Sequence, residues 1–170
     1  MSIGYCVKGI PVVGVIFNPF LNELFEAEEG RGAFLNGKSI RVDTSTGLKD
    51  SLLVNNIGHE RNNSFLEEST QRTYRWLSHG LRGLRMSGSA AQNMGDVACG
   101  RVSCYYEHGY GGPWDVCAGM VIVREGGGVV LDAMDKSDFV LKFGKGSVCC
   151  GNELVVTDVL NVAHVPKVTF

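Results

Sequence analysis

The sequence lacks a hydrophobic run long enough to cross a membrane, and no basic and apolar leader follows Met1. A membrane-spanning helix needs about 20 consecutive apolar residues, so we expect no membrane association. Positive charge is not in excess either, because 16 Lys and Arg stand against 18 Asp and Glu, whereas a nucleic-acid-binding chain is commonly basic. We therefore expect a cytoplasmic protein without a nucleic-acid partner, and an organellar transit sequence upstream stays an open alternative.

The cysteines lack the spacing of a redox or zinc motif. No C-x-x-C pair and no Cys/His pattern occurs, and most of the thiols lie within apolar segments. This favours small core residues in a reducing compartment over a disulfide framework. The six residues are Cys6, Cys99, Cys104, Cys117, Cys149 and Cys150.

The 170 residues, 44% of them hydrophobic, are enough to bury a core and divide into two zones without internal repeats. In residues 1–50, short β-rich runs are broken by turn residues such as Gly9 and Asn36-Gly37, which predicts an antiparallel meander. In residues 51–170, strand-like and helix-like patterns alternate, which predicts a layered α/β sheet. The Thr-, Ser-, Asp- and Gly-rich segment 42–50 is the expected boundary. The expected strands of the second zone are 52–55, 84–86, 103–107, 129–132 and 148–150, and the expected helices are 65–78, 90–99, 116–124 and 154–163.

The most informative segment runs from Gly111 to Gly128, with the sequence GGPWDVCAGMVIVREGGG. Proline cannot lie inside a helix, so the pattern predicts an apolar helix that starts just after Pro113 and stops at the glycines. Asp115 then lies near the helix amino terminus with its carboxylate exposed. That carboxylate is either a helix cap or a ligand, and the local pattern does not decide between the two.

Two other segments are candidates for ligand contact. Gly88, Ser89 and Ala90 join an expected strand to an expected helix, where free backbone N–H groups can bind oxygen atoms of a ligand; ordinary capping and close packing explain the same residues. Glu107 ends an expected strand shortly before Asp115, and α/β proteins bind ligands at such strand ends. A solvated surface glutamate is the alternative at that position.

The segment around Asp115 resembles the carboxyl-terminal signature of the inositol monophosphatase family, which comprises magnesium-dependent, lithium-sensitive phosphatases. The stretch EGRGAFLNGK in the meander also resembles this family, and the segments GGPWD, RMSGS and DVACGR are similar to its plant-type members. The resemblance implies that Asp115 binds Mg²⁺ and a substrate hydroxyl, that Glu107 binds inositol hydroxyls, and that backbone atoms of Gly88, Ser89 and Ala90 contact substrate. It further implies an α/β fold, the layered αβαβα sandwich of that family, a homodimer, and a sugar-alcohol phosphate as substrate.

One element of the family pattern is missing. Metal-dependent hydrolysis of a phosphate monoester needs several carboxylates that hold two Mg²⁺ ions about 3.5–4 Å apart. The family takes most of these ligands from a glutamate and a D-P-[IL]-D-G-T segment upstream of the meander, and this sequence contains no such segment. We therefore expect a carboxyl-terminal portion that lacks the first helical layer and opening strands, with an aggregation-prone sheet edge and little activity alone.

Two functions stay open on this basis. The first is a phosphatase acting on inositol monophosphate, with galactose 1-phosphate, histidinol phosphate or a nucleotide bisphosphate as alternative substrates. The second is a non-catalytic member of the family with a binding or dimerisation role.

Overall fold

Residues 1–144 and 146–165 are described by a computed structural model of the chain. The first five strands form an antiparallel meander in the order β1-β2-β3-β4-β5. Two of its turns have positive φ at both central residues, Lys8-Gly9 and Asn36-Gly37, as the tight turns that match strand twist require. The strands are β1 (Ser2–Val7), β2 (Ile10–Asn18), β3 (Glu23–Glu28), β4 (Ala33–Leu35) and β5 (Lys38–Ile40).

The rest of the chain builds a mixed sheet in the order β7-β6-β8-β10-β9, flanked by four helices. β6 pairs in parallel with β7 and with β8, and β10 runs antiparallel to both of its neighbours. The elements are a 3-10 turn (Leu48–Asp50), β6 (Leu52–Ile57), α1 (Asn63–Ser78), β7 (Gly83–Arg85), α2 (Ala90–Ala98), β8 (Cys104–Tyr110), α3 (Pro113–Glu125), β9 (Val129–Leu131), β10 (Gly146–Gly151) and α4 (Glu153–Ala163).

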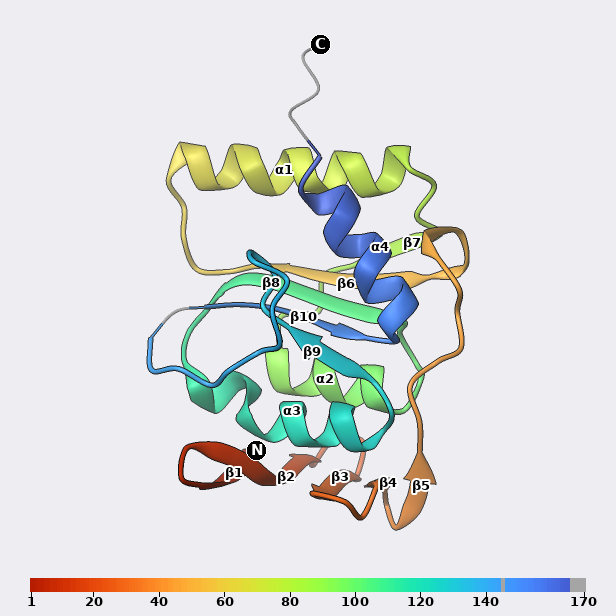
Figure 1. Ribbon diagram of the computed structural model, residues 1–170, viewed down its shortest axis with the longest axis vertical. Helices are drawn as coiled ribbons and strands as arrows, with labels where there is room; N and C mark the ends of the chain where they lie inside the picture. Colours follow the sequence, from red (N-terminus) through yellow and green to blue (C-terminus); the bar gives the residue numbers. More distant parts are fainter. Residues whose placement is uncertain (145, 166–170) are drawn as a thin grey trace.

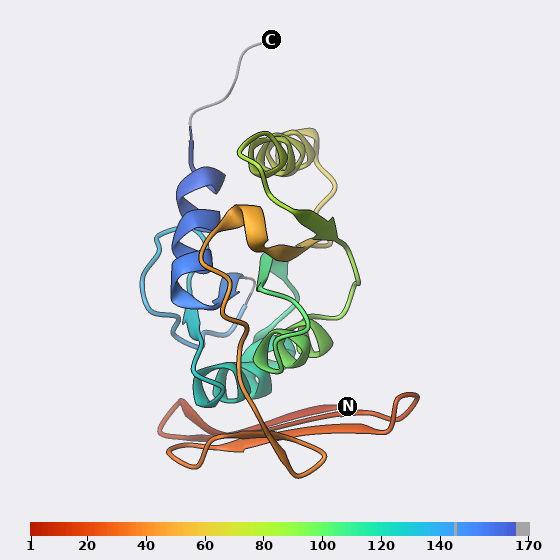
Figure 2. The ribbon, with the colours of Figure 1, turned by 90° about the vertical axis from the view of Figure 1, so that its right-hand side faces the viewer.

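The elements stack in layers, in the order meander sheet, α2 and α3, mixed sheet, α1 and α4 (Figures 1 and 2). The predicted layered α/β fold is thus confirmed. One core cluster joins the meander, α2, α3 and the mixed sheet, and a second lies between the mixed sheet and α1 and α4. α3 lies so close to β2 that a Cβ on Gly14 would come 2.3 Å from the Ala118 carbonyl oxygen.

The outer face of the meander has no layer over it among the described residues (Figure 2). Large apolar side chains of β1 are exposed there, with Ile3 at 54%, Tyr5 at 62% and Val7 at 46% of full exposure. β1 is also an edge strand, so its outer backbone groups are unpaired within the sheet.

None of the described helices combines the length and the hydropathy that a membrane crossing requires. The six cysteines are free thiols, and four of them are buried, as their apolar surroundings in the sequence predicted.

Candidate functional site

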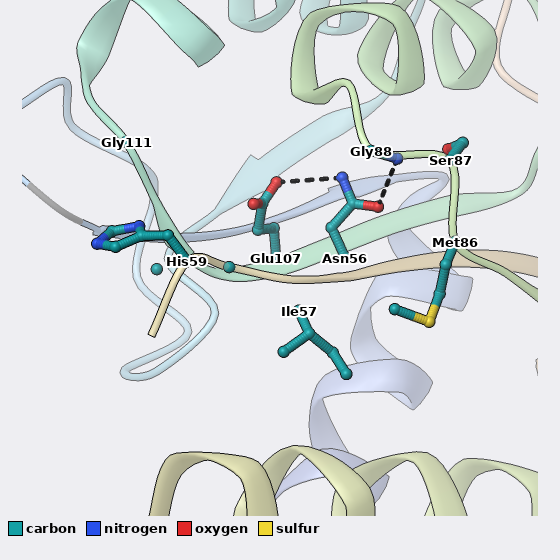
Figure 3. Close-up of a pocket in the computed structure, with 10 residues that line it drawn as sticks. Asn56, Ile57, His59, Met86, Ser87, Gly88, Glu107 and Gly111 are labelled. Atoms are coloured by element: carbon teal, nitrogen blue, oxygen red, sulfur yellow. Dashed lines mark hydrogen bonds between the residues drawn. The ribbon is translucent and has the colours of Figure 1, made fainter. Parts of the chain in front are cut away.

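A cavity of about 510 Å³ opens where β6 and β8 end (Figure 3). Both strands run in the same direction, so their carboxyl ends meet at one edge of the sheet. Ligands of α/β proteins usually bind at such an edge. The cavity is lined by Asn56, Ile57, Gly58, His59, Met86, Ser87, Gly88, Glu107, Gly109 and Gly111.

Glu107 and Asn56 form the polar centre of this cavity. They are register partners on the parallel strands β8 and β6, so the sheet itself brings the two side chains together. Asn56 Nδ2 donates to Glu107 Oε2 at 3.4 Å, and Asn56 Oδ1 accepts from the Gly88 N–H at 3.2 Å. A single amide therefore links the carboxylate to the turn before α2, as the dashed lines of Figure 3 show.

Glu107 is nearly buried, at 8% of full exposure. Burial raises the pKa of its carboxyl above the usual value, and hydrogen bonds from Tyr105 and Asn56 oppose part of that rise. Burial and the neighbouring Glu107 raise the pKa of Tyr105 well above its usual range, so the phenol keeps the proton that it donates to Glu107 Oε2. A strand-end acid with a perturbed pKa in a cleft is a common mark of a functional site.

The turn before α2 presents only part of its backbone to the cavity. Gly88 lines it with φ of 85°, a conformation that favours glycine. The sequence predicted a free N–H at Gly88, but this group donates to Asn56 Oδ1. Ser89 caps α2 by accepting from the Gln92 N–H at 3.4 Å, and Ala90 is the first helical residue. Ser89 and Ala90 are not among the residues that line this cavity.

Asp115 is held beside the cavity by the start of α3. Its Oδ2 accepts from the N–H groups of Gly111 at 2.9 Å and Gly112 at 3.1 Å, so the capping role is present. The helix begins at Pro113 itself, not just after it as predicted, because proline at the first helical position has no N–H to lose and its φ already fits. Both bonds end on Oδ2, so Oδ1 is the oxygen that remains for a ligand.

The described residues do not fit a complete Mg²⁺ site. Within residues 1–144 and 146–165, no three His, Cys, Asp or Glu side chains lie close enough together to hold a metal ion. Asp115 is the residue for which the family resemblance implies Mg²⁺ binding, and one carboxylate cannot fix the near-octahedral shell that this ion requires.

Sequence reasoning missed Asn56, the residue that connects the site. A signal was present, since the apolar run of β6 ends in the pair Asn55-Asn56 at the carboxyl end of a strand. Neither residue belongs to a motif, so their position mattered only once β6 was paired with β8. His59, to which no role was assigned, is exposed at the cavity wall.

Comparison with a family model and with individual relatives points to one family. The model of the inositol monophosphatase family matches residues 1–167. The chain is 50% identical over 132 residues to inositol monophosphatase 2 of Solanum lycopersicum, which is 78% of this chain and 49% of the relative. It is 44% identical over 145 residues to inositol-1-monophosphatase of Synechocystis, which is 85% of this chain and 49% of that protein.

Solved structures show the same fold. The inositol monophosphatase of Anabaena (Nostoc) superimposes with a TM-score of 0.81 at 34% identity, covering 98% of this chain and 66% of that one. The extragenic suppressor protein suhB of Bartonella henselae superimposes with a TM-score of 0.86 at 30% identity, covering 96% of this chain and 60% of that one. The chain spans about half the length of the curated relatives it matches.

Proposed function

Because the chain belongs to the inositol monophosphatase family, we propose that it provides the substrate-hydroxyl side of a magnesium-dependent phosphomonoesterase that acts on inositol monophosphate. Glu107 accepts hydrogen bonds from ring hydroxyls of the substrate. Asp115 contributes to the Mg²⁺ site and contacts a hydroxyl. Gly88 contacts the substrate from the cavity wall, and the backbone of Ser89 and Ala90, which do not line this cavity, contacts the substrate where it extends toward the start of α2.

The main support for this proposal is that the internal hydrogen bonds of the Glu107 carboxylate end on one of its two oxygens. Both internal hydrogen bonds, from Asn56 and Tyr105, end on Oε2, which leaves Oε1 for a ligand in the cavity. A carboxylate held in this way can accept from a hydroxyl donor but cannot rotate away, because its other oxygen is fixed. A sugar alcohol supplies such donors.

Mg²⁺, when bound, stabilises charge on the phosphoryl oxygens and activates water. Asp115 alone cannot supply that chemistry, so no hydrolytic step follows from the described residues. Their contribution is to bind and orient the polyol.

The test compares the 170-residue chain with a chimera. In the chimera, the part of the Solanum lycopersicum relative that precedes its match is joined ahead of this chain. We expect Mg²⁺-dependent, lithium-sensitive release of phosphate from inositol 1-phosphate by the chimera and negligible release by the chain alone. Release by the chain alone that is lost both without metal and in Asp115→Ala would contradict this division of roles, and so would an inactive but folded chimera.

A non-catalytic role is the second candidate, and the lack of a three-ligand group among the described residues favours it. In that case the chain binds a sugar-alcohol phosphate or forms a homodimer without turnover.

Galactose 1-phosphate, histidinol phosphate and a nucleotide bisphosphate are the competing substrates for the chimera. Sedimentation of the chain and cell fractionation test the expected homodimer and cytoplasmic location.

A further inference from the structure

β8 contributes to cavities on both faces of the mixed sheet. Alternate side chains of a strand point to opposite faces, so Glu107 lines the site described above, while Tyr106 and His108 point to the other face and contact Arg72 and Phe65 of α1. α1 lies over that face of the sheet (Figure 1). On that second face is a cavity of about 320 Å³ between β8, the start of α1 and the end of α4. Its wall includes Ser64, Phe65, Glu68, Arg72, His108 and His164.

Two residues of this wall have a buried polar atom without a hydrogen-bond partner among the described residues, Arg72 at Nε and His108 at Nδ1. The Tyr106 hydroxyl is also unpaired, but Tyr106 lies behind Arg72 and does not line the cavity. Arg72 is only 4% exposed, and its guanidinium carbon lies 4.9 Å from the centre of the Tyr106 ring. An unpaired polar group in a protein interior is unfavourable, so two such groups on residues that line one cavity favour a bound ligand there.

The charge at the cavity favours an anion. Glu68 Oε1 lies 2.6 Å from Arg75 Nη2 and 3.8 Å from Arg72 Nη1, so Glu68 pairs mainly with Arg75. Arg72 otherwise donates to the neutral Ser69 hydroxyl at 3.2 Å. The positive charge of Arg72 is therefore only partly balanced.

Two further features agree. α1 has no acidic residue in its first turn, so the positive end of its dipole favours an anion beside Ser64. Asp132, the other acid near Tyr106 and His108, does not line the cavity, and its Oδ1 accepts from the Ser147 hydroxyl and the Met134 N–H. His108 stacks on Phe65 with ring centres 5.2 Å apart, which fixes its nitrogens at the wall.

We propose that this second cavity binds a small phosphate-type oxyanion, held by Arg72 with a hydrogen bond from His108. The ion is either free inorganic phosphate or the phosphoryl group of a small organic phosphate. This cavity and the sugar-alcohol site share no lining residue. A third cavity, of about 190 Å³, adjoins both of them, through His59 and Gly109 on one side and Phe65 and His108 on the other.

The two tryptophans allow a direct test. Trp76 is fully buried and packs edge-on against Tyr106 with ring centres 5.0 Å apart, whereas Trp114 is 66% exposed beside Asp115. In a Trp114→Phe background, Trp76 is the remaining indole and reports on the second cavity. Inorganic phosphate and glycerol phosphate are titrated separately at constant ionic strength. We expect a saturable change in Trp76 fluorescence, and the tighter of the two ligands identifies the source of the phosphoryl group.

Matched variants locate the binding. Arg72→Gln should weaken it by about tenfold or more, since charged hydrogen bonds contribute roughly 1.5–3 kcal/mol; the surface variant Arg82→Gln should bind as before. His108→Phe keeps the ring stack and should weaken binding by a smaller factor. If Arg72→Gln does not fold, the Nε–Hε resonance of Arg72 in the ¹⁵N-labelled chain must shift on titration.

Two results would overturn the proposal. One is no saturable change with either ligand up to tens of millimolar, which would mean that water alone satisfies Arg72 and His108. The other is a change that survives Arg72→Gln but disappears in Asn56→Ala, which would place the anion in the first cavity.

Discussion

Replacement of Asp115 by alanine should destabilise the fold, independently of any metal. Oδ2 of Asp115 accepts from two backbone N–H groups, those of Gly111 and Gly112. A hydrogen bond of this kind contributes about 1 kcal/mol, and a negative charge at a helix amino terminus adds about 0.3–1 kcal/mol. Loss of all three should lower the free energy of unfolding by about 2 kcal/mol, because the side chain is half-buried and its capping bonds fall in the usual range.

Asp115→Asn separates the two contributions. Asparagine keeps one oxygen in the place of Oδ2 and loses the charge, so we expect a loss of only about 0.5–1 kcal/mol. For a chain of this size, about 1 kcal/mol corresponds to roughly 2–4 °C in melting temperature. Asp115→Asn should therefore melt close to the parent chain, and Asp115→Ala clearly below it.

Urea unfolding of the parent chain and the two variants measures this difference. Asp138→Ala is the control, since Asp138 is 80% exposed in its ion pair with Arg124 and such pairs contribute about 0–1 kcal/mol. If Asp115→Ala unfolds at the same urea concentration as Asp138→Ala, the carboxylate does not hold the loop before α3, and the reasoning about its position is refuted.

Three other variants should change stability or association. Glu107→Gln should melt higher than the parent at pH 7, because burial raises the pKa of this acid and disfavours its charged form. This penalty is absent below the unfolded pKa near 4.5 and grows as pH rises through the folded pKa. If the variant and the parent melt at the same temperature both below the unfolded pKa and at pH 7, the expectation is refuted. Gly88→Ala should cost about 1 kcal/mol, since φ of 85° strains any other residue, and calorimetry that finds no loss would contradict the turn geometry. Tyr5→Lys on the exposed edge strand should reduce concentration-dependent association without lowering the melting temperature, whereas a parent chain that is already a monodisperse monomer would remove the basis for this expectation.

The fold was accessible from the sequence because its signals are local. Apolar periodicity placed α1, α2, α3 and α4 nearly at their observed bounds, and the turn pairs Lys8-Gly9 and Asn36-Gly37 carry the positive φ of tight turns. The short strand β5 (Lys38–Ile40) was not separated from its hairpin, because two of its three residues are polar and exposed and only Ile40 is apolar.

The site was accessible only in part, for a physical reason. Asp115 and Glu107 belong to segments with recognisable spacing. Asn56 acts through its register with Glu107 across two parallel strands, and register between distant segments leaves no mark on either of them. The second cavity depends in the same way on Arg72 and His108, which are 36 residues apart by their numbering and meet only when α1 covers β8.

The most direct test of the central claim is the kinetics of Glu107→Gln in the chimera on inositol 1-phosphate and galactose 1-phosphate. If Glu107 binds substrate hydroxyls, the variant should have a raised KM for inositol 1-phosphate and an altered preference between the two substrates, with a smaller change in kcat. Asp115→Asn in the same chimera should instead lose kcat by orders of magnitude on both substrates, since a hard cation needs the charge. Equal losses of kcat in both variants, independent of the substrate, would contradict the assignment of Glu107 to the sugar-alcohol side of the site.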